Sequence, residues 1–359
     1  MRNKIIIHEK RKMCLLTLVF TMVILCVLRN FYILGINQCK NAMVDIYTEG
    51  YSVNGNLFTG TLIDFAKEFL LLFIIPMVFL AVFQYRESKE HRAGEFMLSL
   101  PVTKKQIFWN RTILGVLVYT IPWIVFSGGI LLTRFQYDEW FQEHIASCKH
   151  AGWLLGNESM GNLMMYLCYL WCVLTLMYAV AVFVQNICSR PWIAGAIAVG
   201  MLMFPSVFDY CITRYWQSGY PQAEYWWKNI FLVETPADCI PIWDSGVRQY
   251  IMVTVYDHIV LVALCMILLA MIFFAVAYYM MTVRDASKNQ GFIYIPWMRE
   301  GIYLGISFSF VLYISKVAFE MNMGIAADTA VIVLATAAVY LPARLIGRRR
   351  MKQGGKAHE

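Results

Sequence analysis

The sequence predicts an all-α membrane protein, a polytopic bundle of about eight transmembrane helices. Of its 359 residues, 60% are hydrophobic and only 15% are charged, which lies outside the range of soluble domains. The mean hydropathy of +0.57 agrees with this class. Apolar runs long enough to cross about 30 Å of hydrocarbon recur along the whole chain. Together these observations predict a chain that lies mostly within the bilayer.

Eight apolar runs have the length expected of a membrane span. In order they are Met13–Leu34, Leu62–Tyr85, Ile113–Leu132, Leu163–Val184, Trp192–Phe208, Ile259–Met281, Ile302–Phe319 and Ile325–Leu341. The fifth and eighth runs are short. The fifth follows the fourth through only a tight Ser189-Arg190-Pro191 turn, so a helical hairpin is predicted there.

The distribution of charge predicts which side of the membrane each segment faces. With the amino terminus inside, the inner segments hold 21 of the 30 Lys and Arg residues and 7 of the 23 acids, a net charge of +14. The other segments hold 9 basic and 16 acidic residues, a net charge of −7. Basic residues favour the cytoplasmic side. An even number of spans then places both termini in the cytoplasm.

The segment 86–111, between the second and third runs, is the most informative part of the chain. From Glu87 to Leu100 its residues begin charged and turn apolar, as in a helix that lies along the membrane surface. Pro101 ends that helix. Thr103 and Gln106 then have the spacing of a capping box at the start of the next span. The predicted layout is a span, an amphipathic cytoplasmic helix, a sharp break and another span.

The outer segment 209–257 is long and rich in Trp and Tyr, which favour the headgroup level of a membrane. One interpretation is an interfacial belt. The other is a short helix near 223–233 that re-enters the outer leaflet. Cys211 and Cys239 lie in the same segment, where a disulfide is chemically possible. The residues alone leave these alternatives open.

The sequence lacks the motifs of common nucleotide-binding and hydrolytic sites. It contains no GxxxxGK[ST] phosphate loop, no HExxH, and no GxSxG with a His and an acid nearby. The Gly128-Gly129 pair lies inside the third run, which favours helix packing. No soluble domain offers a basic face, so nucleic acid is not an expected partner. We expect no catalytic residue and no metal site in this chain.

The run Ala93-Gly94-Glu95-Phe96-Met97-Leu98-Ser99-Leu100-Pro101, followed by Lys104-Lys105, resembles the first cytoplasmic loop of type 2 ABC exporter permeases. In that family a Gly-Glu and a Leu-Ser-x-Pro run precede a basic residue. The resemblance covers 1–283, a six-span core with the coupling loop 86–111 and the outer segment 209–257. The cytoplasmic loop and two further spans within 284–346 make the chain similar to eight-span bacterial permeases, and 347–359 forms a basic cytoplasmic tail.

The resemblance implies a permease subunit that exports an amphipathic or apolar substrate, such as a drug, a peptide or a lipid-like molecule, across the bacterial cytoplasmic membrane. A separate ABC ATP-binding subunit would dock on the surface helix. That subunit would bind ATP and Mg²⁺, so this chain would not itself be an enzyme and would hold no cofactor. The docking residues implied are Glu87, Arg92, Gly94, Glu95, Met97, Leu98, Leu100 and Pro101.

In the family, the transport route runs between two permeases, so the resemblance implies a second copy of this chain or a paralogous permease as a partner. Spans two and five would line the route. The residues that they offer are Phe69, Phe73, Phe79, Phe83, Met201, Phe204 and Phe208. Each of these side chains could instead be an ordinary packing residue or could contact membrane lipid.

Two other classes of function remain as alternatives. A membrane-embedded enzyme acting on lipid or cell-envelope substrates would cluster His, Asp, Glu or Ser at one depth. An ion-coupled secondary transporter would place ionisable groups near the midplane. The sequence instead has the pairs Asp64 with Lys67 and Lys316 with Glu320 near predicted span ends. Spacing of three or four residues lets each pair neutralise itself on one helix face, which favours a structural role.

Overall fold

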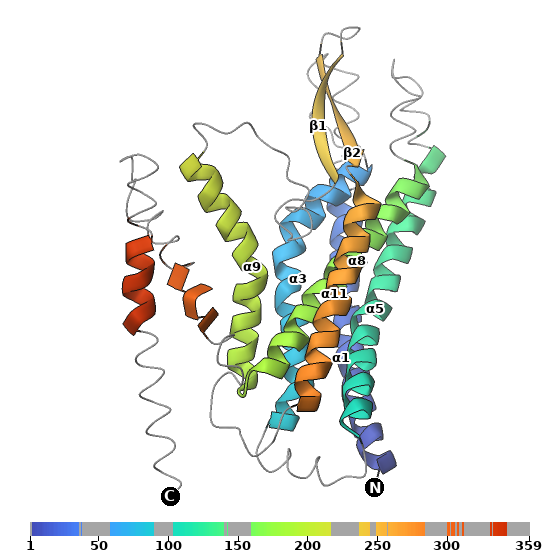
Figure 1. Ribbon diagram of the computed structural model, residues 1–359. Helices are drawn as coiled ribbons and strands as arrows, with labels where there is room; N and C mark the ends of the chain where they lie inside the picture. The colour runs from blue at the N-terminus through green and yellow to red at the C-terminus, as the bar shows by residue number, and fades with distance from the viewer. Residues whose placement is uncertain are drawn as a thin grey trace, which may run out of the picture. The chain divides into compact units, whose positions relative to one another are not determined.

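The computed structural model describes most of the predicted helical core. The residues described are 2–35, 37, 58–89, 103–139, 142, 159–216, 237–244, 249–256, 258–283, 300–301, 303–305, 307–308, 311, 331 and 333–342. Within them the chain is almost entirely helical (Figure 1). The helical class predicted from composition is therefore confirmed for this part of the chain.

Each of the first six predicted spans falls within a described helical segment. The elements are α1 (Arg2–Asn30) with the short π-helix η1 (Phe31–Gly35), α3 (Phe58–Lys89), α5 (Lys104–Gln136), α8 (Met160–Ile187), α9 (Pro191–Trp216) and α11 (Ile259–Val283). Most of these helices extend beyond the apolar runs that predicted them. α5, for example, begins at Lys104 and not at Ile113.

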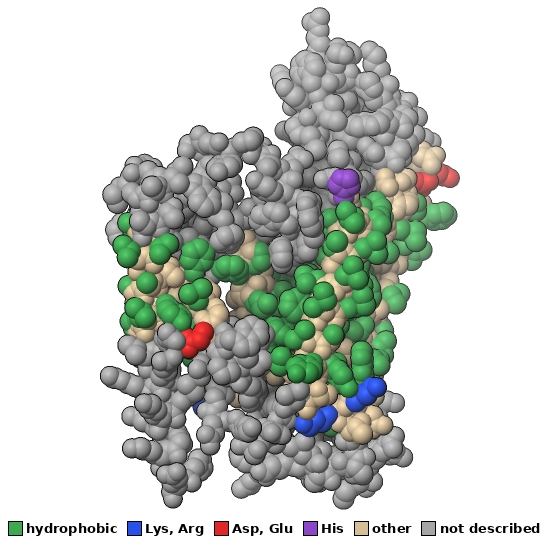
Figure 2. Space-filling model, in the orientation of Figure 1, with side chains coloured by type: hydrophobic (Ala, Val, Ile, Leu, Met, Phe, Trp, Pro, Cys, Tyr) green, Lys and Arg blue, Asp and Glu red, His purple; other side chains and the backbone are tan. Residues whose placement is uncertain are grey.

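Four described helical segments are long and apolar enough to cross a membrane: Arg11–Ile33, Lys104–Gln136, Met160–Ile187 and Ile259–Thr282. α11 supports this assignment, because it buries Ile259, Val262 and Met266 while Leu261 and Leu264 stay exposed. Figure 2 shows hydrophobic side chains over the visible faces of the described helices. An apolar exposed face is expected of a helix in contact with lipid. The chain is a membrane-embedded protein.

The described parts of the seventh and eighth predicted spans are short. Helical residues lie within 300–311, and a helix covers Val333–Pro342. The hydroxyl of Tyr340 donates a hydrogen bond to Glu300 Oε2 at 2.6 Å. The end of the predicted eighth span thus contacts Glu300, two residues before the predicted seventh span.

Local sequence accounts for several helix ends. The N–H of Gln106 donates to Thr103 Oγ1 at 3.3 Å, and the N–H of Ile107 donates to the Thr103 carbonyl at 3.1 Å. Thr103 therefore caps α5, as its spacing predicted. Ser159 caps α8 in the same way, because its hydroxyl accepts from the N–H of Asn162 at 3.3 Å.

The chain divides into two compact units. The first unit comprises Met1–Pro76, Trp109–Leu176 and Thr235–Leu269, and the second comprises Met77–Phe108, Met177–Glu234 and Ala270–Glu359. α3, α5, α8 and α11 contribute residues to both units. The second unit contains the end of α3 and the start of α5, the two helix ends that flank the predicted docking segment.

The described residues depart from an all-helical fold at the hairpin of β1 (Ala237–Asp244) and β2 (Gln249–Tyr256). The strands pair antiparallel, with Cys239 opposite Thr254 and Trp243 opposite Tyr250. β2 reads Gln-Tyr-Ile-Met-Val-Thr-Val-Tyr, rich in the β-branched and aromatic residues that favour strands. Trp and Tyr also favour a membrane interface, so the sequence pattern predicts an interfacial segment here and gives no prediction of the strands.

The outer segment also begins later than predicted. α9 continues through 209–216, which are the first residues of the predicted outer segment 209–257. No Gly or Pro interrupts these residues, so nothing in the sequence ends the helix at Phe208. The helix proposed near 223–233 and the possible Cys211–Cys239 disulfide lie outside the residues and side chains that the structure describes.

Candidate functional site: the helix ends that flank the docking segment

Most of the implied docking residues, from Arg92 to Pro101, lie outside the described residues. Glu87 lies on α3, although its side chain is not among those described. α3 continues to Lys89, so the first three residues predicted for the surface helix belong to α3. No Gly or Pro precedes Gly94 in this stretch, so a helical continuation meets no breaker. The site is defined by its two flanks.

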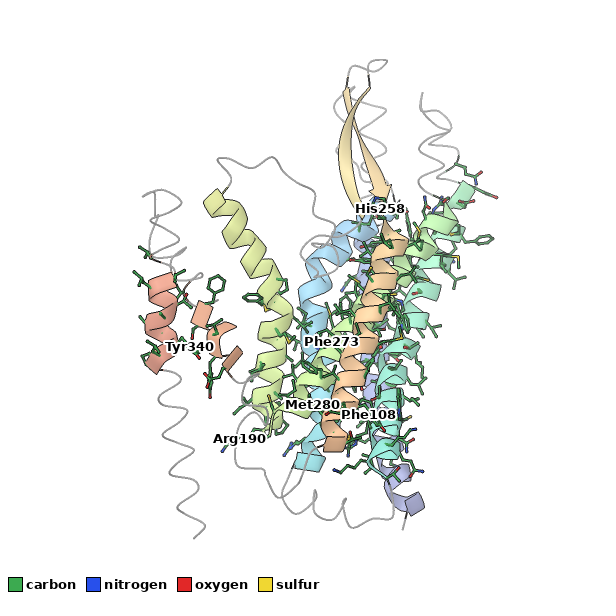
Figure 3. All side chains as sticks on the ribbon, in the orientation of Figure 1. Phe108, Arg190, His258, Phe273, Met280 and Tyr340 are labelled. Atoms are coloured by element: carbon green, nitrogen blue, oxygen red, sulfur yellow. The ribbon has the colours of Figure 1, made fainter. Side chains whose placement is uncertain are left out.

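The start of α5 is fastened to the end of α11. Lys104 Nζ donates a hydrogen bond to the carbonyl oxygen of Thr282 at 3.2 Å. A cation in this position interacts favourably with the negative end of the α11 dipole. One turn further along α5 lies Phe108, which Figure 3 labels and which is fully buried. Its ring lies 5.5 Å from that of Tyr278. A polar and an apolar contact therefore hold this flank.

The end of α3 is fastened to α8. The hydroxyl of Tyr178 donates to Gln84 Oε1 at 2.7 Å, and both side chains are buried. The Tyr178 ring also lies 6.0 Å from that of Phe274 on α11. A second ring pair, Phe183 with Phe273 at 5.2 Å, joins the same two helices. α8 thus lies between the α3 flank and α11.

α9 packs against α3 at Gly195. Ala194, Gly195 and Ala198 are buried, and a Cβ added to Gly195 would lie 2.8 Å from Val82 Cγ2. Small residues allow the helix backbones to approach closely within a membrane. The predicted hairpin between α8 and α9 is confirmed, and Gln185 Nε2 closes it by donating to the Pro191 carbonyl at 2.9 Å.

The structure brings some of the implied route residues together. Phe79 is 42% exposed and stacks on Phe83 with ring centroids 5.9 Å apart. It also lies 6.5 Å from Trp192 on α9, an exposed ring that sequence reasoning had treated only as the start of a span. Further along α9, Met201 is exposed and Phe204 is partly buried, while Phe73 is partly buried on α3. The side chains of Phe69 and Phe208 are outside those described.

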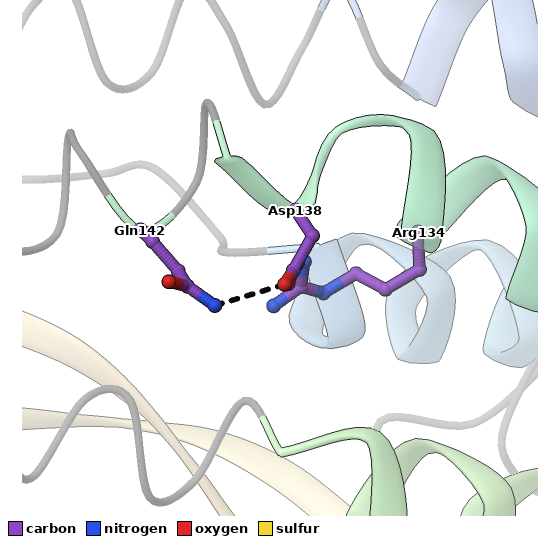
Figure 4. Close-up of polar contacts among 3 residues, drawn as sticks. All are labelled: Arg134, Asp138 and Gln142. Atoms are coloured by element: carbon purple, nitrogen blue, oxygen red, sulfur yellow. Dashed lines mark hydrogen bonds and ion pairs between the residues drawn. The ribbon is translucent and has the colours of Figure 1, made fainter.

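Two buried arginines on α5 were not singled out from the sequence. Arg111 is 3% exposed although it lies only seven residues beyond Lys104, and an arginine inside a membrane helix is costly. Arg134 is also buried and forms an ion pair with Asp138, which accepts a second hydrogen bond from Gln142 at 2.8 Å (Figure 4). The signal was present in the sequence, because Arg111 and Arg134 each lie two residues outside the apolar run Ile113–Leu132.

Among the described residues, no group of three His, Cys, Asp or Glu side chains is placed to hold a metal ion. The side chains of the predicted ionisable pairs, Asp64 with Lys67 and Lys316 with Glu320, lie outside that set. No protein-family model, curated protein or solved structure matched this chain. The two flanks and the residues joined to them are therefore the basis for proposing a function.

Proposed function

We propose that this chain is the permease subunit of an ATP-driven ABC exporter in the bacterial cytoplasmic membrane. The observation that carries the proposal is the anchoring of both flanks of 90–102 in one compact unit, together with the final parts of α8 and α11. A partner that docks on such a segment acts on a packed group of helices.

The docking surface suits a separate ATP-binding subunit. Its charged residues, from Glu87 to Glu95, precede the apolar Met97 and Leu98, so one surface offers both ion pairs and a side chain for a cleft. ATP and Mg²⁺ bind to the partner, and the energy of hydrolysis reaches this chain as movement of α3 and α5. Both termini lie in the cytoplasm in this arrangement.

The substrate route forms against a second permease, either a copy of this chain or a paralogue. Exposed aromatic side chains on α3 and α9, Phe79 and Trp192 above all, provide its wall. Such a wall has apolar and aromatic surface, which suits an amphipathic or apolar substrate. Export of a drug, a peptide or a lipid-like molecule fits this chemistry.

The docking surface is tested with Glu95→Lys and Leu98→Asp, each expressed with the ATP-binding subunit encoded nearest to this gene. Each change puts a wrong charge into the surface, at a cost of about 2–5 kcal/mol if the group is buried on docking. We expect loss of co-purification and of substrate-stimulated ATPase activity, with normal membrane insertion. Glu139→Lys, an exposed charge reversal beyond the far end of α5, is the matched control. Unchanged association in both docking variants would reduce the segment to a connector.

A further inference from the structure

Tyr178 contacts two neighbouring helices through different parts of its side chain. Its hydroxyl donates to Gln84 Oε1 on α3 at 2.7 Å, and its ring lies 6.0 Å from Phe274 on α11. Tyr178 has no exposed surface and Gln84 is only 4% exposed. Water therefore has little access to compete for this hydrogen bond. The bond holds the Tyr178 hydroxyl and the Gln84 amide in a defined direction and at a defined distance. This side chain therefore links the α3 flank to α11.

The contacts continue from α11 to the other flank. The side chains of Phe274 and Tyr278 are four residues apart, so they follow one another along the same face of α11, and the backbone carbonyl of Thr282 lies one turn further along the helix. Phe274 contacts α8, Tyr278 packs on Phe108, and Thr282 accepts the hydrogen bond of Lys104. All of these residues belong to the second unit. One face of α11 thus connects α8 with the start of α5.

We propose that Tyr178 is a positioning residue that makes the two flanks of the docking segment move together. The flanks at Lys89 and Lys104 are joined through Gln84, Tyr178, Phe274 and Tyr278 as well as through residues 90–102. A push on the segment is then shared by α3, α8, α11 and α5. The use of this link in transport rests on the proposed function, whereas the mechanical link itself does not.

The two parts of the Tyr178 side chain can be separated. Tyr178→Phe keeps the ring against Phe274 and removes the hydrogen bond to Gln84, so it releases α3 while it preserves the contact with α11. Tyr119→Phe is the matched control, because the Tyr119 hydroxyl donates to Thr175 Oγ1 at 3.0 Å in the first unit. Each variant removes one buried tyrosine hydroxyl that makes a hydrogen bond to or from α8. Only Tyr178→Phe removes a hydrogen bond to one of the two flanks.

The mechanical link is tested by measuring the distance between spin labels at Lys89 and Lys105 in a cysteine-free background, in lipid nanodiscs. We expect a narrow distance distribution in the parent protein, loss of the narrow peak in Tyr178→Phe, and a narrow peak in Tyr119→Phe. A narrow peak in Tyr178→Phe would overturn the proposal. This measurement needs no partner subunit, so its outcome does not depend on the proposed function.

A double variant separates positioning from simple stability. In the double variant Gln84→Met with Tyr178→Phe, both partners become apolar at similar volume. The decrease in thermal midpoint caused by Tyr178→Phe alone should therefore be reversed. The narrow peak should remain lost, because no directional contact replaces the hydrogen bond. Recovery of the peak together with stability would show an ordinary packing role and would overturn the proposal.

The consequence for transport is measured in the complex with the ATP-binding subunit. Tyr178→Phe should keep association and basal ATPase activity and lose the stimulation by substrate, whereas Tyr119→Phe keeps all three. Retained stimulation in Tyr178→Phe would contradict the coupling role. If the parent protein does not associate with any ATP-binding subunit, the proposed function fails, and the spin-label distances still decide whether Tyr178 joins the flanks.

Discussion

At the scale of single residues, His258 determines how α11 begins. Its φ of 47° lies in the left-handed region, and its carbonyl accepts the first hydrogen bond of the helix, from the N–H of Val262 at 3.0 Å. β-Branched residues are strained in this conformation, whereas Asn, Asp and His tolerate it better. His258 therefore joins the last residues of β2 to α11 at a point where backbone conformation restricts the choice of side chain.

We predict that His258→Val lowers the thermal midpoint of the purified protein and that His258→Asn leaves it close to the parent value. The left-handed conformation costs an ordinary side chain about 1–2 kcal/mol, and a β-branched one is affected most. Both variants remove the imidazole, so their difference reports the backbone alone. Equal midpoints for the two variants would show that the side chain, and not φ, makes this position sensitive.

Residue-scale features differ in how far the sequence could predict them. The cap at Thr103 was predictable, because its partner Gln106 lies three residues away. The bond between Tyr178 and Gln84 was not, because its partners are separated by 94 residues. Hydropathy marks Gln84 and Tyr178 only as parts of two separate apolar runs. Which polar side chains meet inside the bundle depends on helix packing, which one sequence does not specify.

At the scale of elements, the close approach of α9 to α3 depends on Gly195. A Cβ at this position would lie 2.8 Å from Val82 Cγ2 and 3.5 Å from Val78 Cγ1. Val82 is β-branched and has few rotamers with which to move away. Gly200 lies on the same helix with open space at its Cβ position. Substituting each glycine by alanine changes helix propensity in the same way at both positions. A difference in stability between the two variants therefore reports the packing at Gly195.

We predict that Gly195→Ala destabilises the protein by about 1–3 kcal/mol through overpacking. Gly200→Ala should be neutral or should stabilise by about 0.5–1 kcal/mol, because Ala favours a helix more than Gly does. Thermal unfolding in one detergent compares the two. Adding Val82→Ala to Gly195→Ala makes room for the new methyl group and should restore part of the loss. A Gly195→Ala variant as stable as Gly200→Ala would contradict the packing described for α3 and α9.

The elements themselves were predictable where hydrophobicity alone decides, as for α8 and α11. Ends were less predictable, because polar residues extend a helix without changing its apolar run: α5 begins nine residues before Ile113. The hairpin of β1 and β2 was missed because Trp and Tyr favour both a membrane interface and a strand. The docking residues were named from a resemblance, and Arg92 to Pro101 remain outside the described structure.

At the scale of the whole molecule, charge makes a prediction that concerns every segment at once. The predicted inner segments carry +14 and the remaining segments −7, which favours a cytoplasmic position for both termini and for 86–111. Reversing the orientation would place the basic excess outside, against the known bias. The proposed function requires the same orientation, because an ATP-binding subunit reaches only the cytoplasmic side.

We predict that a cysteine at Ser88 is labelled by a membrane-impermeant maleimide only after the cells are permeabilised. The background lacks the native cysteines, and a cysteine at Glu139, an exposed position beyond the far end of α5, is the control that should react in intact cells. Ser88 precedes α5 along the chain and Glu139 follows it, so if α5, which at about 1.5 Å per residue is long enough to cross the hydrocarbon, spans the membrane, the two positions face opposite sides. Labelling of Ser88→Cys in intact cells, with Glu139→Cys protected, would invert the topology and place the docking segment where no ATP-binding subunit could reach it.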